Sequence, residues 1–227
     1  MHRRLKHSVM SPSHVSRARV LPVNLERQWI NLCRQYLPVP SASIWRYSRD
    51  WLPTDPAQGW KLHISGTILN AGRVLSKVAP TLRHHDLLYK APASLFELEE
   101  LNRGVVYGYS QVGKFITVYP RTAEDAVLLA EQLHLLTQGI AGPSIPFDGR
   151  YRSDGCIYYR YGAFKNIGDS DGKIILDPDG KACKDGRDGT IKPAWAADLF
   201  LAKETDHKAA AATLLKTRFR AFRALAQ

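Results

Sequence analysis

The sequence is poor in cysteine, has no long apolar run and has no excess of acidic residues. Its three cysteines, Cys33, Cys156 and Cys183, are scattered through 227 residues without a Cys-x-x-Cys pair. Such a set argues against a disulfide framework or a zinc site and is typical of reduced thiols. No apolar stretch approaches the roughly 20 residues needed to cross a membrane. Residues 1–20 lack the apolar segment of a secretion signal. We therefore expect a cytoplasmic protein with no membrane partner.

The deficit of acidic residues leaves the chain strongly basic. The sequence has 32 Lys and Arg against 21 Asp and Glu, a formal net charge of +11. This surplus predicts an anionic partner, such as nucleic acid, anionic lipid, or a phosphorylated or acidic peptide. No aromatic RNA-binding motif or helix-turn-helix signature is apparent, so nucleic acid is not the expected partner.

Hydrophobic residues make up 44% of the chain, which predicts a folded protein with a sizeable core. Apolar periodicity predicts helices at 24–37, 69–78, 94–102 and 122–138, and strands at 60–65, 86–90, 114–119 and 156–161. Capping-box spacing places helix starts at Ser94 and Thr122.

The mixture of helices and strands predicts an α+β fold, a single domain with a central, largely antiparallel sheet flanked by helices. We expect this domain to span residues 21–205, between a basic N-terminal tail (1–20) and a basic C-terminal helix (206–227). Within it, the Gly- and Asp-rich segment 168–190 is expected to form turns.

Two polar residues stand out in the strand predicted at 60–65. Lys61 and His63 are two positions apart, so strand geometry places both side chains on one face of the sheet. The apolar Leu62 and Ile64 then lie on the other face. A cation beside an imidazole costs stability unless an anion binds there. The pair therefore predicts an anion site whose chemistry uses a proton donor.

Four motifs follow one another along the chain: WKLHIS at 60–65, LLYK at 87–90, SQVGKFITVYP at 110–120 and GRYRSDGCIYYRYGAF at 149–164. In this order they resemble the lyase domain at the N-terminus of class III and class IV lanthipeptide synthetases. That domain is similar in turn to the phosphothreonine lyase effectors of bacterial pathogens. The resemblance covers residues 45–200.

The resemblance implies a β-elimination that uses neither metal nor cofactor. A kinase first phosphorylates Ser or Thr in a ribosomally made precursor peptide, and the lyase then removes phosphate to leave dehydroalanine or dehydrobutyrine. After Trp195 the sequence has no Gly-rich phosphate loop, kinase catalytic loop or zinc-ligand cysteines. The expected partners are therefore the phosphorylated precursor and a separate kinase and cyclase. The chain is either an excised domain or a lyase that stands alone.

Three residues match the catalytic positions of the resembled family. The resemblance implies that Lys90 is the general base that removes the α-proton and that His63 is the general acid for the leaving phosphate. It also implies that Lys61 contacts the phosphate and a carbonyl group. An α-proton beside an amide is weakly acidic, so its removal needs a neutral base and fixed positive charge near the developing enolate. A lysine surrounded by other cations loses its proton more readily.

Four further residues match phosphate contacts. The resemblance implies that Arg150 and Arg160 form a guanidinium clamp, with Arg103 and Lys114 as additional contacts. Paired arginines grip phosphate through bidentate hydrogen bonds. Taken singly, each of these residues would more often be an ordinary surface or core side chain, and the order of the motifs favours the catalytic interpretation. The alternative is a non-catalytic module of lyase fold that binds a phosphopeptide or a precursor peptide.

Overall fold

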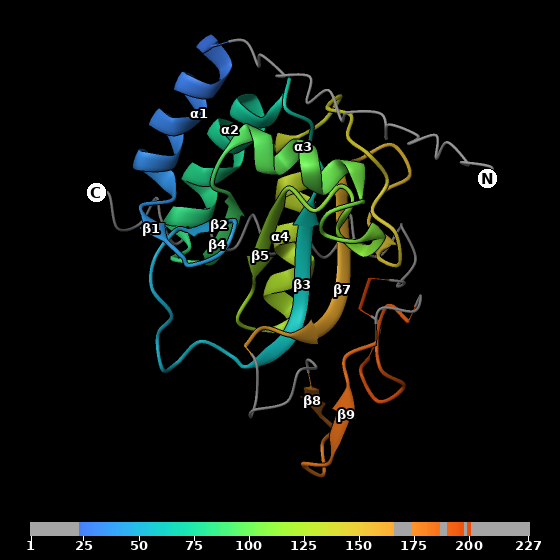
Figure 1. The fold of residues 1–227 in the computed structure, drawn as a ribbon. Helices are drawn as coiled ribbons and strands as arrows, with labels where there is room; N and C mark the ends of the chain where they lie inside the picture. Colours follow the sequence, from blue (N-terminus) through green and yellow to red (C-terminus); the bar gives the residue numbers. More distant parts are fainter. Residues whose placement is uncertain (1–22, 166–173, 187–189, 198, 201–227) are drawn as a thin grey trace, which may run out of the picture.

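The computed structural model describes residues 23–165, 174–186, 190–197 and 199–200. The tail expected at 1–20 and the helix expected at 206–227 lie outside these ranges. The helices are α1 (Val23–Tyr36), α2 (Ala71–His84), α3 (Leu95–Arg103), the short 3-10 helix η1 (Tyr109–Gln111) and α4 (Ala123–Leu136) (Figure 1). Among the described helices, none has the length and apolar character of a membrane span.

Seven strands form one sheet in the order β1-β2-β4-β5-β3-β7-β6. They are β1 (Val39–Pro40), β2 (Trp45–Tyr47), β3 (Gln58–Ile64), β4 (Leu88–Pro92), β5 (Ile116–Tyr119), β6 (Gly149–Arg150) and β7 (Ile157–Ala163). Every neighbouring pair in this sheet is antiparallel. The predicted fold class, an α+β domain with a largely antiparallel sheet and flanking helices, is confirmed.

A separate hairpin follows the main sheet. It consists of β8 (Ile174–Leu176) and β9 (Ala182–Lys184), which pair antiparallel. The hairpin lies within the 168–190 segment, so the prediction of turns alone was incomplete. The short apolar run Ile174–Leu176, whose middle residue Ile175 is buried, provides the strand-forming signal there.

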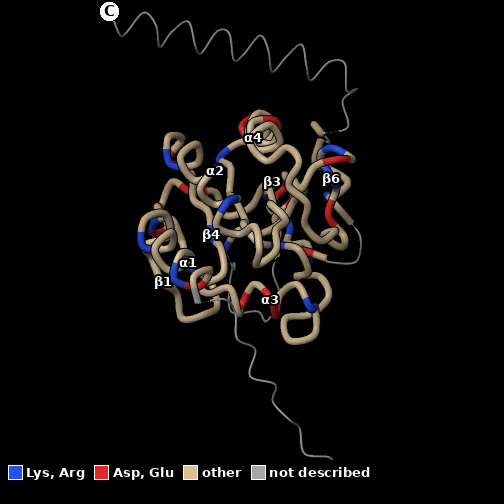
Figure 2. The backbone as a smooth tube through the Cα atoms, turned by 90° about the horizontal axis from the view of Figure 1, so that it is seen from above, with Lys and Arg blue, Asp and Glu red and all other residues tan. Residues whose placement is uncertain are grey.

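The two faces of the sheet have different surroundings. Leu62 and Ile64 of β3 are fully buried in the main core, which also contains Val78 of α2 and Leu133 of α4. Figure 2 shows α2 and α4 on one side of the sheet and α3 on the other. Because β3 alternates, Lys61 must lie on the face opposite the α2 and α4 core.

The predicted caps of α3 and α4 are confirmed. The Ser94 hydroxyl accepts a hydrogen bond from the Glu97 N–H at 3.2 Å, and the Thr122 hydroxyl accepts one from the Asp125 N–H at 3.0 Å. Each bond satisfies a donor in the first helical turn that has no partner within the helix.

Helix α2 continues six residues beyond its predicted end at residue 78, and Pro80 lies inside it. A proline in a helix interior costs about 3 kcal/mol relative to alanine. Burial offsets this cost, because Ala79 and Leu82 are fully buried in the core while Pro80 itself is exposed.

Candidate active site

Predicted site residues lie in two neighbouring rows across the sheet face that is turned away from α2 and α4. In the first row, Lys90 on β4 is opposite Thr117 on β5, and Thr117 is opposite His63 on β3. In the second row, Lys61 on β3 is opposite Arg160 on β7. Directly opposite residues of antiparallel strands share a face. Since adjacent strands are about 4.8 Å apart, the Cα atoms of Lys90 and His63 are separated by about 10 Å, with Thr117 between them.

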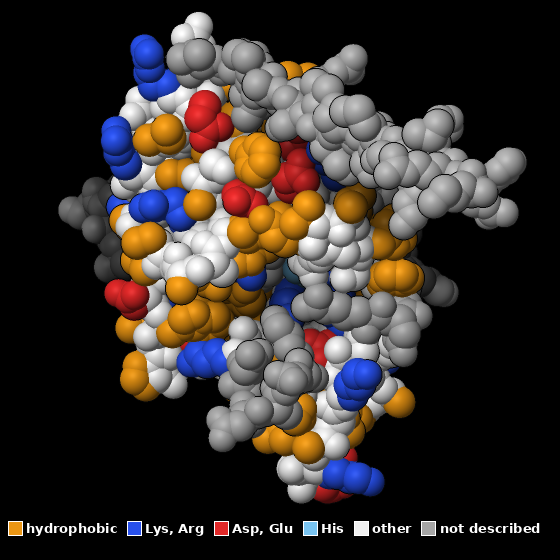
Figure 3. All heavy atoms as spheres, in the orientation of Figure 1, with side chains coloured by type: hydrophobic (Ala, Val, Ile, Leu, Met, Phe, Trp, Pro, Cys, Tyr) orange, Lys and Arg blue, Asp and Glu red, His pale blue; other side chains and the backbone are white. Residues whose placement is uncertain are grey.

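These rows form the floor of a pocket. Its cavity volume is about 40 Å³, and its lining residues are Trp45, Lys61, His63, Lys90, Gln111, Lys114, Thr117, Tyr119 and Arg160. Five of the seven predicted site residues are in this set. In Figure 3, basic and histidine side chains are visible in a hollow near the centre of the molecular face, bordered by hydrophobic side chains.

A buried carboxylate, Asp148, contacts two residues of the pocket, and no motif predicted it. Its side chain is completely buried, with Oδ2 2.5 Å from His63 Nδ1 and Oδ1 3.3 Å from Lys114 Nζ. Asp148 comes directly before β6, at the start of the GRYRSDG motif. Its position next to this motif is the sequence feature that could have identified Asp148 as a site residue.

The protonation state of His63 follows from its burial. Removal from water lowers the pKa of His63 to about 4, an effect that Asp148 opposes and that Lys114 and Lys61 reinforce. Burial alone would raise the pKa of Asp148, but His63, Lys114 and Arg160 outweigh it and hold that pKa below its ordinary value. Near pH 7 the unliganded site therefore holds a neutral imidazole and a carboxylate. The carboxylate accepts the Nδ1–H hydrogen bond and leaves Nε2 unprotonated.

Asp185 plays the corresponding role for the second row. Arg160 Nη2 donates to Asp185 Oδ1 at 2.5 Å and also to the Gly186 carbonyl, and Lys61 Nζ is 3.9 Å from Asp185 Oδ2. Arg160 Nε is buried and has no hydrogen-bond partner among the described residues. The guanidinium is thus fixed on one edge by Asp185 and the Gly186 carbonyl.

Lys90 lies at the other end of the pocket, half-buried on β4. Its Nζ is 4.1 Å from the ring centroid of Trp45 and 6.0 Å from that of Tyr47. Ammonium groups are attracted to the faces of aromatic rings. These contacts, which the sequence analysis did not predict, orient the side chain that the resemblance assigns as the base.

Two predicted phosphate contacts lie outside the pocket. Arg150 donates from Nε and Nη2 to the Gly155 carbonyl, at 3.0 and 2.9 Å, and its guanidinium is 5.6 Å from the Tyr158 ring. Arg103, at the end of α3, donates to Glu100 at 3.0 Å, and its side chain is 44% exposed. Their contact with phosphate stays a prediction.

The charges of the pocket favour an anion. It is lined by four cations, Lys61, Lys90, Lys114 and Arg160. Two buried carboxylates, those of Asp148 and Asp185, form ion pairs with them. Positive charge therefore exceeds negative charge, and buried charges attract a counter-ion more strongly than exposed ones do. Within the described ranges, no three His, Cys, Asp or Glu side chains gather as metal ligands.

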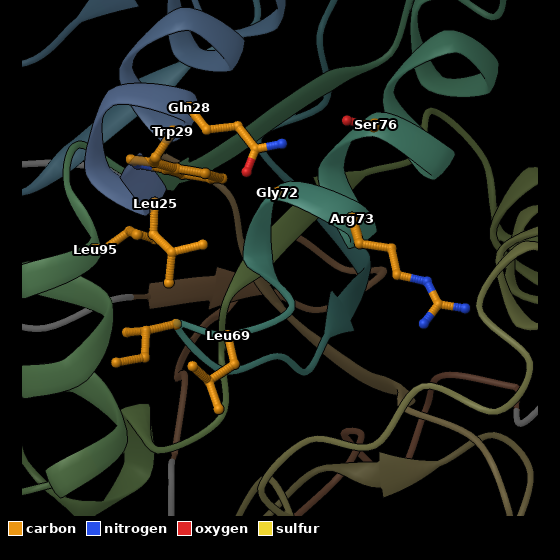
Figure 4. Close-up of a pocket in the computed structure, with 9 residues that line it drawn as sticks. Leu25, Gln28, Trp29, Leu69, Gly72, Arg73, Ser76 and Leu95 are labelled. Carbon is orange, nitrogen blue, oxygen red and sulfur yellow. The ribbon is translucent and has the colours of Figure 1, made fainter. Parts of the chain in front are cut away.

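A second pocket lies between α1 and α2 (Figure 4). Leu25, Leu69 and Leu95 converge on it, while the guanidinium of Arg73 points away from them (Figure 4). None of the residues predicted from the motifs lines this pocket. The residues predicted from the motifs gather instead in the cationic pocket.

Comparison with known sequences gives one family and one curated relative. Residues 36–212 match the family described as RamC, N-terminal domain. The probable SapB synthase of Streptomyces coelicolor is 33% identical over 186 residues, which cover 76% of this chain and 20% of the relative. The chain thus spans about a fifth of the length of that relative.

Solved structures of phosphothreonine lyases are similar over part of the chain. The Salmonella protein SpvC has a TM-score of 0.42 and 14% identity, covering 59% of this chain and 74% of its own. OspF from Shigella flexneri has a TM-score of 0.42 and 16% identity, covering 60% and 75%.

Proposed function

The chain belongs to the RamC N-terminal domain family, and on that premise we propose that it eliminates phosphate from phosphoserine or phosphothreonine in a ribosomally made precursor peptide. The observation that carries the proposal is the meeting of Lys61, His63, Lys90, Lys114 and Arg160 in one pocket. The name of the relative, a probable SapB synthase, supports a role in biosynthesis. A kinase that supplies the phosphorylated residue and a cyclase are the partners proposed for this step.

The reaction requires a base and an acid on either side of the substrate. The Lys90 amine, acting in its deprotonated form, removes the Cα proton, the Cα–Cβ double bond forms, and the Cβ–O bond breaks. The oxygen leaves with the bonding electron pair and receives a proton from His63. Lys90 and His63 suit these roles because they flank the small side chain of Thr117 in one row.

The second row and Lys114 bind the phosphate. The guanidinium of Arg160 and the ammonium groups of Lys61 and Lys114 supply fixed positive charge around the phosphate. These groups already occupy ordered positions through Asp185 and Asp148. Preorganised positive charge stabilises both the departing phosphate and the enolate-like carbon that develops when the α-proton is removed.

The proton on His63 arrives with the substrate. Burial lowers the pKa of His63 to about 4, so Nε2 is unprotonated in the free protein at neutral pH. A bound phosphate dianion would raise the pKa of His63, and a phosphate monoester, whose second pKa is about 6, can also bring its own proton. Asp148 then stabilises the imidazolium as its buried counter-ion.

Mass spectrometry tests the proposal. A phosphoserine or phosphothreonine peptide incubated with the protein, without metal or nucleotide, should lose about 98 Da, whereas a phosphatase would remove about 80 Da. Lys90→Ala and His63→Ala should each abolish the loss and retain the fold, and retained activity in both would refute the assignment. An unchanged mass together with phosphate-dependent binding would instead support the non-catalytic binding module.

A further inference from the structure

Two exposed aromatic side chains lie beside the cationic pocket. Tyr109 of η1 is 66% exposed, and Phe147, which precedes β6, is 40% exposed. Their ring centroids are 6.0 Å apart and their planes are nearly perpendicular. We call this pair the apolar rim. Val105 and Val106, in the connection between α3 and η1, are also well exposed.

The apolar rim is joined to the pocket at both of its residues. Gln111, two positions after Tyr109, lines the pocket, and Asp148, which follows Phe147, contacts His63. The η1 segment is anchored nearby, because the Gly113 N–H donates to the Asn102 side chain at 3.1 Å.

Core packing does not account for the conformation of Phe147. This residue has φ +65°, in the left-handed region that is unfavourable for a bulky L-residue, and yet its ring remains partly in water. The buried contacts of Asp148 hold the backbone beside it in place. Strain of this kind persists where surrounding structure enforces it, and it concentrates at ligand sites.

On the basis of the proposed function, we infer that the apolar rim binds side chains that flank the phosphorylated residue of the substrate peptide. The preferred substrate then has a large apolar residue, such as Leu or Phe, within one or two positions of the phosphoserine or phosphothreonine. An extended peptide advances about 3.3 Å per residue, so with the phosphate in the pocket its close neighbours reach the adjoining rim. Two aromatic rings offer far less surface than the roughly 800 Å² per partner of a stable protein–protein interface, which favours a peptide over a second copy of the chain.

Two synthetic phosphoserine peptides that differ in their flanks test this inference. One has Leu on both sides of the phosphoserine, and the other has Ser. We expect kcat/KM for loss of phosphoric acid to be about tenfold higher for the Leu peptide, mainly through a lower KM, because the rim contact forms before the reaction and persists through it.

Variants locate the source of the preference. Tyr109→Ala and Phe147→Ala should each reduce the ratio of kcat/KM between the two peptides toward one. Leu135→Ala is the matched control, because Leu135 is 50% exposed on α4, on the other side of the sheet. It should leave the ratio unchanged. Thermal unfolding of each variant checks that the fold is retained.

The outcomes separate this inference from the proposed function. Equal kcat/KM for the two peptides, or a preference that persists in both rim variants, overturns the inference and leaves the lyase proposal intact. If neither peptide loses mass, the lyase proposal fails. Fluorescence anisotropy then tests the rim, through the ratio of the affinities for the Leu and Ser peptides in the unmodified protein and in the two rim variants. Equal affinity, or no binding of either peptide, then overturns the inference as well.

Discussion

Asp148 links two functional groups through its two carboxylate oxygens, one beside His63 and one beside Lys114. It therefore sets both the tautomer of the proposed acid and the position of a proposed phosphate ligand. Asp185 performs a similar linkage between Arg160 and Lys61. At the residue scale, the pocket depends on buried carboxylates that need not touch the substrate.

The first prediction concerns Asp148→Asn. The amide keeps the shape of the side chain but removes the charge that stabilises a protonated His63 and holds Lys114. We expect kcat for elimination to fall by about 10- to 100-fold, as for other residues that orient a catalytic group. The pH profile of kcat should also shift to lower pH, which a merely structural defect would not cause. Asp179→Asn, in the exposed β8–β9 connection, is the matched control, and an equal loss there would contradict the role of Asp148.

The second prediction concerns stability below neutral pH. In the unfolded chain His63 takes up a proton near its ordinary pKa of 6.5, whereas in the folded protein it does so only near 4. The unfolded state therefore binds more protons in that window, and stability falls as the pH drops from 6.5 to 4. At pH 5 the loss amounts to about 2 kcal/mol relative to pH 7. Urea titrations at pH 7 and pH 5 measure this decrease in the free energy of unfolding. In His63→Gln the decrease should be smaller by about 2 kcal/mol. A decrease equal to that of the unmodified protein would contradict the role of His63 burial.

At the scale of the elements, periodicity was informative and long-range pairing was not. The alternation in β3 correctly placed Lys61 and His63 on one face, and the capping boxes located the starts of α3 and α4. The insertion of β5 between β4 and β3 could not be predicted, because strand order depends on contacts distant in the sequence. Asp148 and Asp185 were missed for a related reason, since they lie outside regular strands and have no periodic signal.

The third prediction concerns Pro80 in α2. Replacing this exposed proline with alanine restores a backbone N–H and improves helix propensity, while the unfolded chain gains some freedom. We expect the free energy of unfolding to rise by about 1–3 kcal/mol. Chemical denaturation measures the change, with Ser76→Ala on the same exposed side of α2 as a control that should change stability by less. A destabilised Pro80→Ala protein would show that the ring stabilises the helix instead.

The whole molecule combines a formal net charge of +11 with a pocket in which cations exceed carboxylates. The positive surface attracts anionic peptides, and salt limits the range of this attraction to about 10 Å at 0.1 M ionic strength. The buried cations of the pocket are screened less, so they supply the part of binding that persists in salt. Any ligand that binds only the folded state must then stabilise the whole fold.

The fourth prediction uses this linkage. Inorganic phosphate at ten times its dissociation constant should stabilise the protein by about 1.4 kcal/mol and raise the unfolding midpoint by several degrees. Arg160→Ala should remove most of this shift. Arg34→Ala should retain it, because Arg34 is exposed on α1 and donates to the Asn31 side chain outside the pocket. A shift of equal size in both variants would place the phosphate elsewhere.

The register of β3 against β7 has a consequence for how the protein acquires its activity. Lys61 and Arg160, which face each other across these strands, are about 100 residues apart in the sequence. Contacts of such separation form late, because closing a long loop costs entropy before any pairing repays it. During synthesis the pocket cannot exist until β7 has emerged and joined β3. In refolding, catalysis should therefore return in one slow phase, after most helical signal has recovered.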